Sequence, residues 1–331
     1  MANYNTIRGL RVKYLSADPA NPEAGQVWYN STTGNLRVDG IALAASWASA
    51  PNINTARAAL SGGSGAGTQA AALIFGGSVP PSTQTNKTEE FNGSSWSEVT
   101  NFPLSAEWQM AVGTQTAAIT FGGYTPSGDF TSSFDYDGTN WTANPNLNIA
   151  GRVRTGFGTQ TAAIAAAGSP RSGIGDRSES WNGSAWTNGP NTGSQAEGRG
   201  GMSGSPQTAG LIFGGSPPSP GQNVESWNGS AWSEVNNLTN KRRYTAGFGT
   251  ASVGVAVAGI GTANISACES WDGTNFSADA ALSAARSQLG NAAGAPGTAG
   301  FIYSGGLPGG PTNTTEQYTG AATVVKNIST S

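Results

Sequence analysis

The sequence predicts an all-β fold in which one four-stranded sheet is repeated six times, and three observations lead to this prediction. A short motif, typified by Ser178–Trp186 (SESWNGSAW), recurs along the chain. An apolar run, typified by Ala71–Gly77 (AALIFGG), precedes each copy. Of the 331 residues, 49 are Gly and only 11% are charged, which is typical of turn-rich β proteins. The turn glycines lie 44 to 47 residues apart, at Gly93, Gly138, Gly183, Gly229, Gly273 and Gly320.

Each repeat divides into four β segments. The first ends near a Gly-Thr-Gln sequence, and the second is the apolar run, which reads as a strand buried on both faces. A variable loop rich in Pro, Ser and Gly follows, as at residues 78–82, and such loops are the better place to look for binding. The third and fourth strands meet at Asn-Gly or Asp-Gly, for which we expect a tight type I′ turn. One repeat therefore predicts one antiparallel sheet.

Six such sheets can bury both faces by stacking around an axis, which predicts a six-bladed β-propeller. The last copy, near Gly320, has no closing Trp, whereas Trp47 precedes the first complete repeat. We therefore expect the segment around Trp47 to supply the outer strand of the sixth blade and close the ring. The alternative is a seventh blade built around an N-terminal hairpin. The recurring Trp residues are interpreted as sheet-packing residues rather than sugar-binding platforms.

Residues 1–43 lack the repeat. Within them, Gln26–Val38 alternates β-forming residues around a polar turn and predicts a β-hairpin. The preceding Asp18–Pro22 favours an extended approach, which suits a docking arm, although a strand packed on its own domain is the alternative. We therefore divide the chain into an N-terminal arm and hairpin, residues 1–43, and a propeller, residues 44–331.

A charged pair recurs with the repeats. Glu lies two residues before the third-strand aromatic in five repeats, and an Arg lies upstream in the same five. The second repeat has Phe134 and Glu107 instead, so both partners are lost together. We predict partly buried structural ion pairs, with a ring of arginines binding an anionic ligand as the alternative. The predicted pairs are Arg57–Glu89, Arg152–Glu179, Arg199–Glu225, Arg243–Glu269 and Arg286–Glu316.

Composition and motifs exclude several functions. A net charge of -3 gives no field for nucleic acid, and no stretch approaches the roughly 20 apolar residues of a membrane helix. The N-terminus has no secretory signal, and the lone Cys268 reads as a buried strand residue. The absence of His removes the usual general base and the commonest zinc ligand. We expect neither an enzyme nor a cofactor or metal site, and Asp135–Gly138 is only a weak match to a calcium loop.

The paired Gly, the third-strand aromatic and the fourth-strand Trp resemble the kelch repeat over residues 47–320, with a shorter hairpin than is usual in that family. The sequence motifs WNGSAW, GTQTAA and FGG also resemble those of kelch-like arrays in virion proteins of marine bacteriophages. Residues 25–38 (GQVWYNSTTGNLRV) resemble hairpins near the start of phage tail-fibre proteins.

These resemblances imply a phage virion structural protein of tail-fibre or decoration type. Its arm would dock on other virion proteins, and its propeller would be displayed for attachment to the host surface, with surface glycans as candidate receptors. One alternative is a purely architectural tail or capsid-decoration protein. Another is a sialidase-like glycan hydrolase, because Ser133–Trp141 loosely matches the Asp-box of six-bladed sialidases.

Overall fold

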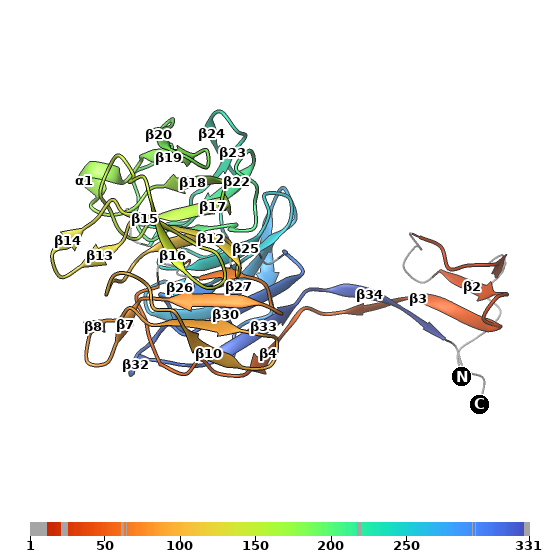
Figure 1. Ribbon diagram of the computed structural model, residues 1–331. Helices are drawn as coiled ribbons and strands as arrows, with labels where there is room; N and C mark the ends of the chain where they lie inside the picture. The colour runs from red at the N-terminus through yellow and green to blue at the C-terminus, as the bar shows by residue number, and fades with distance from the viewer. Residues whose placement is uncertain are drawn as a thin grey trace. The chain divides into compact units, whose positions relative to one another are not determined.

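The computed structural model describes residues 12–20, 26–60, 63, 65–216, 220–292, 294 and 296–327. Within these ranges the fold is all-β, with many four-stranded sheets and one short helix, α1 (Arg171–Ile174) (Figure 1). The chain forms two compact units, residues 46–319 and residues 1–45 together with 320–331. The first boundary lies close to the predicted one. The C-terminal segment, however, belongs with the N-terminal unit and not with the repeats.

In residues 46–319, each repeat contributes strands to a four-stranded antiparallel sheet. The first strand of each sheet is short and rich in small residues, the second is the apolar run, and the third and fourth form the hairpin. The sheets are β5 (Gly65–Gly67), β6 (Ala72–Phe75), β9 (Thr88–Phe91) and β10 (Trp96–Val99); β11 (Met110–Thr114), β12 (Ala117–Phe121), β15 (Ser133–Tyr136) and β16 (Trp141–Asn144); β17 (Thr155–Thr159), β18 (Ala162–Ala166), β19 (Ser178–Trp181) and β20 (Trp186–Asn188); β21 (Gly200–Gly201), β22 (Gly210–Phe213), β23 (Val224–Trp227) and β24 (Trp232–Val235); β25 (Ala246–Gly249), β26 (Gly254–Ile260), β27 (Asn264–Trp271) and β28 (Phe276–Asp279); and β29 (Gly290–Asn291), β30 (Ala299–Tyr303), β33 (Thr315–Thr319) and β4 (Ser46–Ala50).

Neighbouring sheets meet through their first strands. In order, β5 contacts β11, β11 contacts β17, β17 contacts β21, β21 contacts β25, β25 contacts β29, and β29 contacts β5. Small residues permit this close approach, because a Cβ added at Gly65 would lie 1.6 Å from the hydroxyl of Tyr303, and one added at Gly290 would lie 2.3 Å from the same ring.

The sixth sheet takes its outer strand from the beginning of the repeat unit. β4 pairs antiparallel with β33, and Trp47 lies opposite Tyr318. The segment around Trp47 therefore supplies the outer strand of this sheet, as predicted. The predicted N-terminal hairpin consists of β2 (Val27–Asn30) and β3 (Asn35–Leu43). It forms a sheet with β1 (Lys13–Leu15) and β34 (Ala322–Asn327) in the other compact unit.

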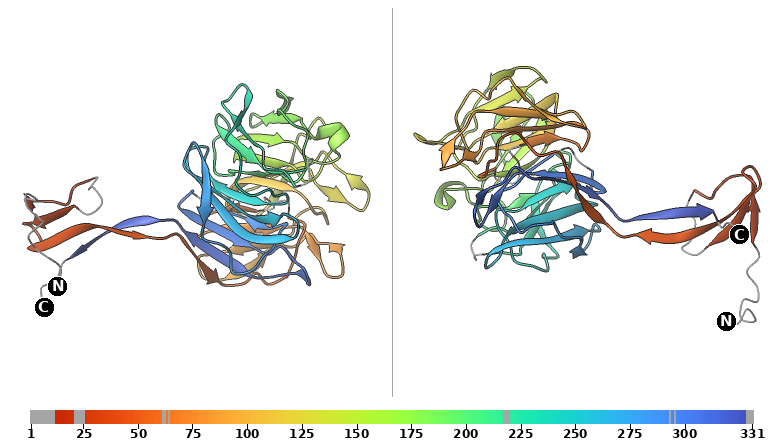
Figure 2. Two further views of the ribbon diagram at one scale, coloured as in Figure 1. Left: turned by 180° about the vertical axis from the view of Figure 1, so that it is seen from behind. Right: turned by 90° about the horizontal axis from the view of Figure 1, so that it is seen from below.

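The C-terminal strand pairs with the N-terminal hairpin over most of its length. β34 runs antiparallel to β3 from Arg37 opposite Asn327 to Leu43 opposite Ala322, and Figure 2 shows the two strands side by side. On the other side of the hairpin, β1 pairs parallel with β2. The carboxylate of Asp18 accepts hydrogen bonds from Trp28 and Asn30, at 3.0 and 2.8 Å. The predicted arm thus contributes an edge strand to a small sheet.

The hairpin turns of the repeats differ from the predicted type I′ geometry. Phe91 lies opposite Trp96, so the connecting loop has four residues. Asn92 accepts hydrogen bonds through Oδ1 from the backbone N–H groups of Ser94 and Ser95, at 3.0 and 2.9 Å. Only the glycines of these turns have a positive φ, between 89° and 95° in five repeats. The Asn or Asp side chain therefore closes the turn, a role that suits these residues.

The recurring aromatic residues are sheet-packing residues, as predicted. Trp181 is 1% exposed and donates its indole N–H to the carbonyl of Gln160 at 2.9 Å. The ring centroids of Trp181 and Trp186 lie 5.4 Å apart, and both residues belong to a buried cluster that includes Phe121 of the preceding repeat. Cys268 is also buried, as its strand position indicated. Aromatic packing thus joins one sheet to the next.

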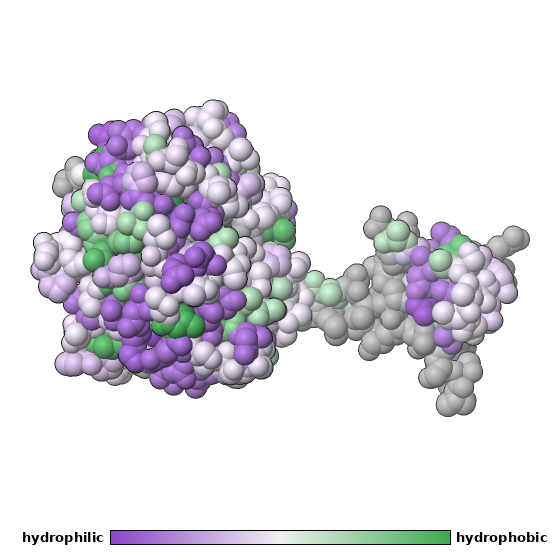
Figure 3. All heavy atoms as spheres, viewed as in Figure 1, coloured by the Kyte–Doolittle hydropathy of each residue, from purple (hydrophilic) through white to green (hydrophobic). Residues whose placement is uncertain are grey.

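Outside this core the surface is largely polar. In the face shown in Figure 3, hydrophobic residues form small separate areas among hydrophilic ones. In the described part of the chain, the large hydrophobic residues with substantial exposure are Val12, Tyr14 and Val253. None of the described helices is long and apolar enough to span a membrane.

Candidate functional site

Within the described ranges, the repeats contain five buried Arg–Glu pairs, and three have the predicted partners. Arg57 pairs with Glu89, Arg199 with Glu225 at 2.6 Å, and Arg286 with Glu316 at 2.6 Å. The other two predicted arginines were wrong. Glu179 pairs with Arg154 at 3.1 Å rather than with Arg152, and Glu269 pairs with Arg242 rather than with Arg243.

The two errors arise because the guanidinium reaches its Glu from two backbone positions. In each repeat, one residue close to the Arg position has a positive φ between 50° and 69°, and we call it the reference residue. The six reference residues are Ala59, Trp108, Val153, Gly198, Tyr244 and Gln288. In repeats one, five and six, the Arg lies two residues before the reference residue. In repeats three and four, it lies one residue after it. A fixed count from the glycine motif cannot separate these cases.

The occupants of the two positions are complementary. Where Arg lies before the reference residue, the later position holds Leu60, Thr245 or Leu289. Where Arg lies after it, the earlier position holds Gly151 or Ala196. The second repeat has Ala106 and the buried Gln109 at the two positions, and Phe134 at the position of the Glu. Each junction therefore has room for one long polar side chain.

These pairs are structural. The five arginines are 0% to 2% exposed, and burial lowers the pKa of Arg57, Arg154, Arg242 and Arg286, with the partner carboxylate opposing that shift where both act. Arg remains protonated in proteins. Arg242 also donates to the carbonyl of Ala267 at 2.8 Å, and Glu269 accepts from the backbone N–H of Thr239 at 2.6 Å. Each guanidinium is buried and bound to its own Glu, which favours the structural interpretation over an anion-binding ring.

The six reference residues form a separate, variable feature. Backbone hydrogen bonds join four successive pairs of them, from Trp108 N–H to the Ala59 carbonyl at 2.8 Å, from Val153 to Trp108 at 3.1 Å, from Tyr244 to Gly198 at 2.7 Å and from Gln288 to Tyr244 at 3.0 Å. Their backbone conformation is shared, whereas their side chains range from none to indole. Variation on a fixed backbone is typical of a surface that carries specificity.

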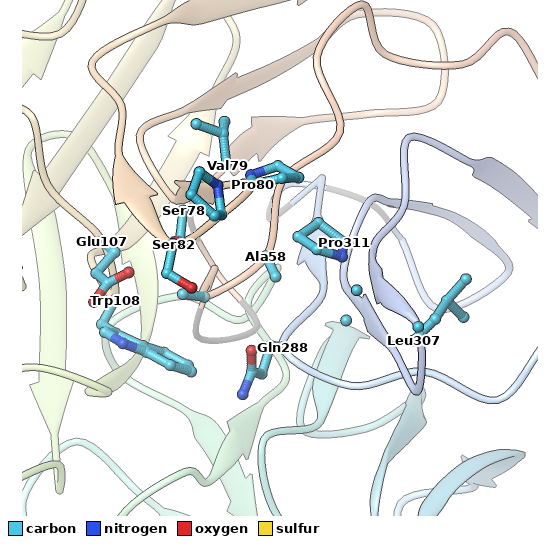
Figure 4. Close-up of a pocket in the computed structure, with 15 residues that line it drawn as sticks. Ala58, Ser78, Val79, Pro80, Ser82, Glu107, Trp108, Gln288, Leu307 and Pro311 are labelled. Carbon is cyan, nitrogen blue, oxygen red and sulfur yellow. The ribbon is translucent and has the colours of Figure 1, made fainter.

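The larger of two adjoining pockets opens beside these residues, with a volume of ≈ 650 Å³. Its lining includes Trp108, Gln288, Glu107, the loop Ser78–Ser82 and the turn around β31 (Gly306–Leu307) and β32 (Gly310–Pro311). Figure 4 shows the indole of Trp108 extending from its backbone toward Gln288, with Ser82 and Pro311 also at the pocket. The variable loop at residues 78–82, expected to be a place for binding, lies here.

A second pocket of ≈ 370 Å³ shares Glu107 and Trp108 with the first. It is also lined by Arg152, Glu197 and Tyr244. Arg152, which was assigned to a structural pair, instead binds Asp129 at 2.8 Å, and its guanidinium carbon lies 4.7 Å from the centre of the Tyr124 ring. The rings of Trp108 and Tyr244 are 5.5 Å apart. Arg243, the other misassigned residue, lies over Tyr244 at 5.1 Å.

The pocket residues were not predicted as a site. The available signal was that Glu107 replaces the Arg of the second repeat and that Trp108 follows it outside the Trp motif. Together these side chains offer an aromatic surface, an amide and carboxylates, which is a set suited to holding a polar ligand with apolar faces.

The segment that resembles an Asp-box or calcium loop lies away from this pocket. Ser133–Tyr136 is strand β15, and the Asp137 carboxylate that follows accepts backbone N–H groups of Thr139 and Asn140 at 2.8 and 2.7 Å. Those hydrogen bonds lower the pKa of Asp137. The same contact recurs through Asn182 in the third repeat, so this carboxylate closes a turn.

Comparison with known proteins gives no assignment: no protein-family model matches the chain, and no curated protein matches it.

Proposed function

We propose that residues 46–319 form a six-bladed β-propeller and that the protein is a phage virion structural protein displaying this propeller for attachment to the host surface. The observation that carries the binding role is the pair of adjoining pockets around Trp108, where side chains vary on a repeated backbone. A propeller is supported by the cyclic order of first-strand contacts and by the pairing of β4 with β33.

The virion location is supported by the resemblance of the repeat motifs and of the N-terminal hairpin sequence to phage structural proteins. In this proposal the unit made of residues 1–45 and 320–331 docks on other virion proteins, while the propeller faces the host. Many weak sites on one particle give avidity.

The decisive experiment images intact particles with an antibody against the propeller and measures binding of the purified full chain to host cells. Label on particles together with binding to cells is the expected result. Label without binding would favour the purely architectural alternative. Absence from the particle would refute the virion role.

We propose binding without hydrolysis. The lining of the larger pocket contains one carboxylate, Glu107, and no Arg; Glu197 and Arg152 line the adjoining pocket, where Arg152 is bound to Asp129. Carboxylate-based glycoside hydrolysis generally uses a pair of acidic groups. The sialidase-like alternative predicts reducing sugar released from host glycans by the purified chain, and its appearance would overturn this part of the proposal.

A further inference from the structure

The larger pocket has the shape and lining of a small-molecule site. Its ≈ 650 Å³ falls within the range of about 300–1,000 Å³ that is usual for such sites. Proline and glycine residues of two loops form much of its wall, and Trp108, Gln288 and Glu107 contribute larger side chains. The pocket thus combines apolar walls with a few polar groups, as ligand pockets generally do.

The polar groups of these three residues are available to a ligand. Among the described residues, no protein group bonds the indole N–H of Trp108, the amide of Gln288 or the carboxylate of Glu107. All three residues are half-buried. An indole N–H donates, a carboxylate accepts, and an amide does both. The set therefore suits a ligand that carries several hydroxyl groups.

The charge of the lining argues against an anionic ligand. Glu107 is the one charged residue among those that line the larger pocket, and the five arginines that an acidic sugar could have used are buried with their own glutamates. Within the larger pocket, a carboxylate of the ligand would meet a like charge at Glu107 without a cation. Arg152 of the adjoining pocket is already bound to Asp129. An uncharged ligand avoids this cost.

We propose that this pocket binds an uncharged oligosaccharide, with one sugar ring stacked on the indole of Trp108 and its hydroxyl groups bonded to Gln288 and Glu107. The amphipathic indole matches the apolar face and polar rim of a sugar ring. Because Trp108 and Glu107 also line the ≈ 370 Å³ pocket, a chain of sugars extends past Trp108 toward Tyr244. This inference rests on the proposed attachment function and names its ligand.

The repeats themselves show that the key variants are compatible with the fold. Ala59 occupies the Trp108 position in the first repeat with φ 58°, against 63° for Trp108. Trp108→Ala and Gln288→Ala therefore place a residue that the same backbone already accepts. Tyr14, which is 74% exposed in the other unit, provides the matched aromatic control Tyr14→Ala.

The test measures binding of the purified full chain to an array of oligosaccharides, followed by titration calorimetry of each hit. Uncharged probes include cellotriose, maltotriose and triacetylchitotriose, and anionic probes include 3′-sialyllactose and trigalacturonic acid. We expect uncharged probes to bind, Trp108→Ala to weaken binding about tenfold or more, and Trp108→Phe to restore part of the loss. Tyr14→Ala should bind like the parent protein, and Glu107→Gln should raise the relative binding of anionic probes.

The proposal is overturned if anionic probes are preferred, if no uncharged oligosaccharide on the array binds, or if Trp108→Ala binds as tightly as the parent protein while retaining its unfolding temperature. Binding of the labelled chain to host cells is measured in parallel. Cell binding that survives Trp108→Ala would remove the pocket assignment and leave the attachment function intact. Failure of the parent chain to bind host cells would instead remove the attachment function.

Discussion

The side-chain amide of Gln115 donates a hydrogen bond of 2.8 Å to the main-chain carbonyl of Phe91 in the preceding repeat. The same amide donates to the carbonyl of Ala72 at 3.0 Å, so one side chain spans two strands of the neighbouring sheet. Three other repeats have the same bridge, from Gln69 to Gly300 and Tyr318, from Gln160 to Ala118 and Tyr136, and from Gln207 to Ala163 and Trp181. The Gln69 bridge joins the first repeat to the sixth.

We expect Gln115→Ala to destabilise the fold by about 1–3 kcal/mol, because two carbonyls lose their amide donor. Chemical denaturation measures the change. Gln84→Ala, on the short strand β8 (Thr83–Gln84), is the control, since no hydrogen bond forms to the Gln84 side chain among the described residues. Equal stabilities of the two variants would show that the bridge does not hold the sheets together.

The third repeat offers a paired test of the buried ion pairs. Arg154→Ala leaves Glu179 buried without its guanidinium and should lower stability by about 3–5 kcal/mol. Arg152→Ala removes a partly exposed pair with Asp129 and should cost less than about 1 kcal/mol. Thermal unfolding of both variants distinguishes the partners. A larger loss for Arg152→Ala would contradict the pairing described above.

Gly183 should resist substitution because its φ is 89° and an added Cβ would lie 3.2 Å from the carbonyl of Thr161. We expect Gly183→Ala to cost at least about 1 kcal/mol. Gly309→Ala is the control, since that glycine has no atom within 4 Å of an added Cβ. Denaturation midpoints compare the two, and a neutral Gly183→Ala would show that the turn relaxes.

Cys268 should be unreactive in the native protein. Burial raises the pKa of its thiol from 9.0 to about 12, and the thiolate is the nucleophile. Since the folded pKa is the higher one, the stability that this group contributes is complete below pH 9 and is lost as the pH rises toward 12. Iodoacetamide should modify the chain at pH 9 only after denaturation. Rapid modification without denaturant would contradict the burial.

The excision of the repeat unit is a further test. Leu43 lies opposite Ala322 in the pairing of β3 with β34, so the chain leaves and re-enters the smaller unit at adjacent positions. Replacing residues 44–321 by a short Asn-Gly turn should preserve this strand pair. Far-ultraviolet circular dichroism and amide exchange of the shortened chain would report it. An unstructured product would show that the smaller unit depends on the repeats.

Much of the fold followed from the repeat pattern. The apolar runs and hairpin motifs located the strands because their periodicity reflects burial directly. The origin of the outer strand near Trp47 could also be predicted, since the sixth copy lacked a closing Trp. The pairing of β34 with β3 could not, because it joins two ends of the chain and no local pattern specifies such a partner.

The predictions that were wrong, the turn type and two of the Arg partners, depend on geometry within one turn. Asn92 and its counterparts favour type I′ turns by composition, but a four-residue loop lets the side chain cap two backbone N–H groups. The arginines failed for a similar reason, since adjacent candidates such as Arg242 and Arg243 differ only in which face of the segment they occupy. The pocket around Trp108 escaped notice because its residues come from different repeats.

The connection of the two units bears on how such a chain could diversify. The smaller unit is discontinuous in sequence, whereas the repeats form one uninterrupted insert between β3 and β34. A single recombination event that exchanges residues 46–319 would therefore replace the whole insert and leave both strands of its base in place. Within the insert, the reference positions already accept side chains from glycine to tryptophan. Substitutions at these positions could thus alter the ligand in small steps, whereas exchange of residues 46–319 could alter it in one step.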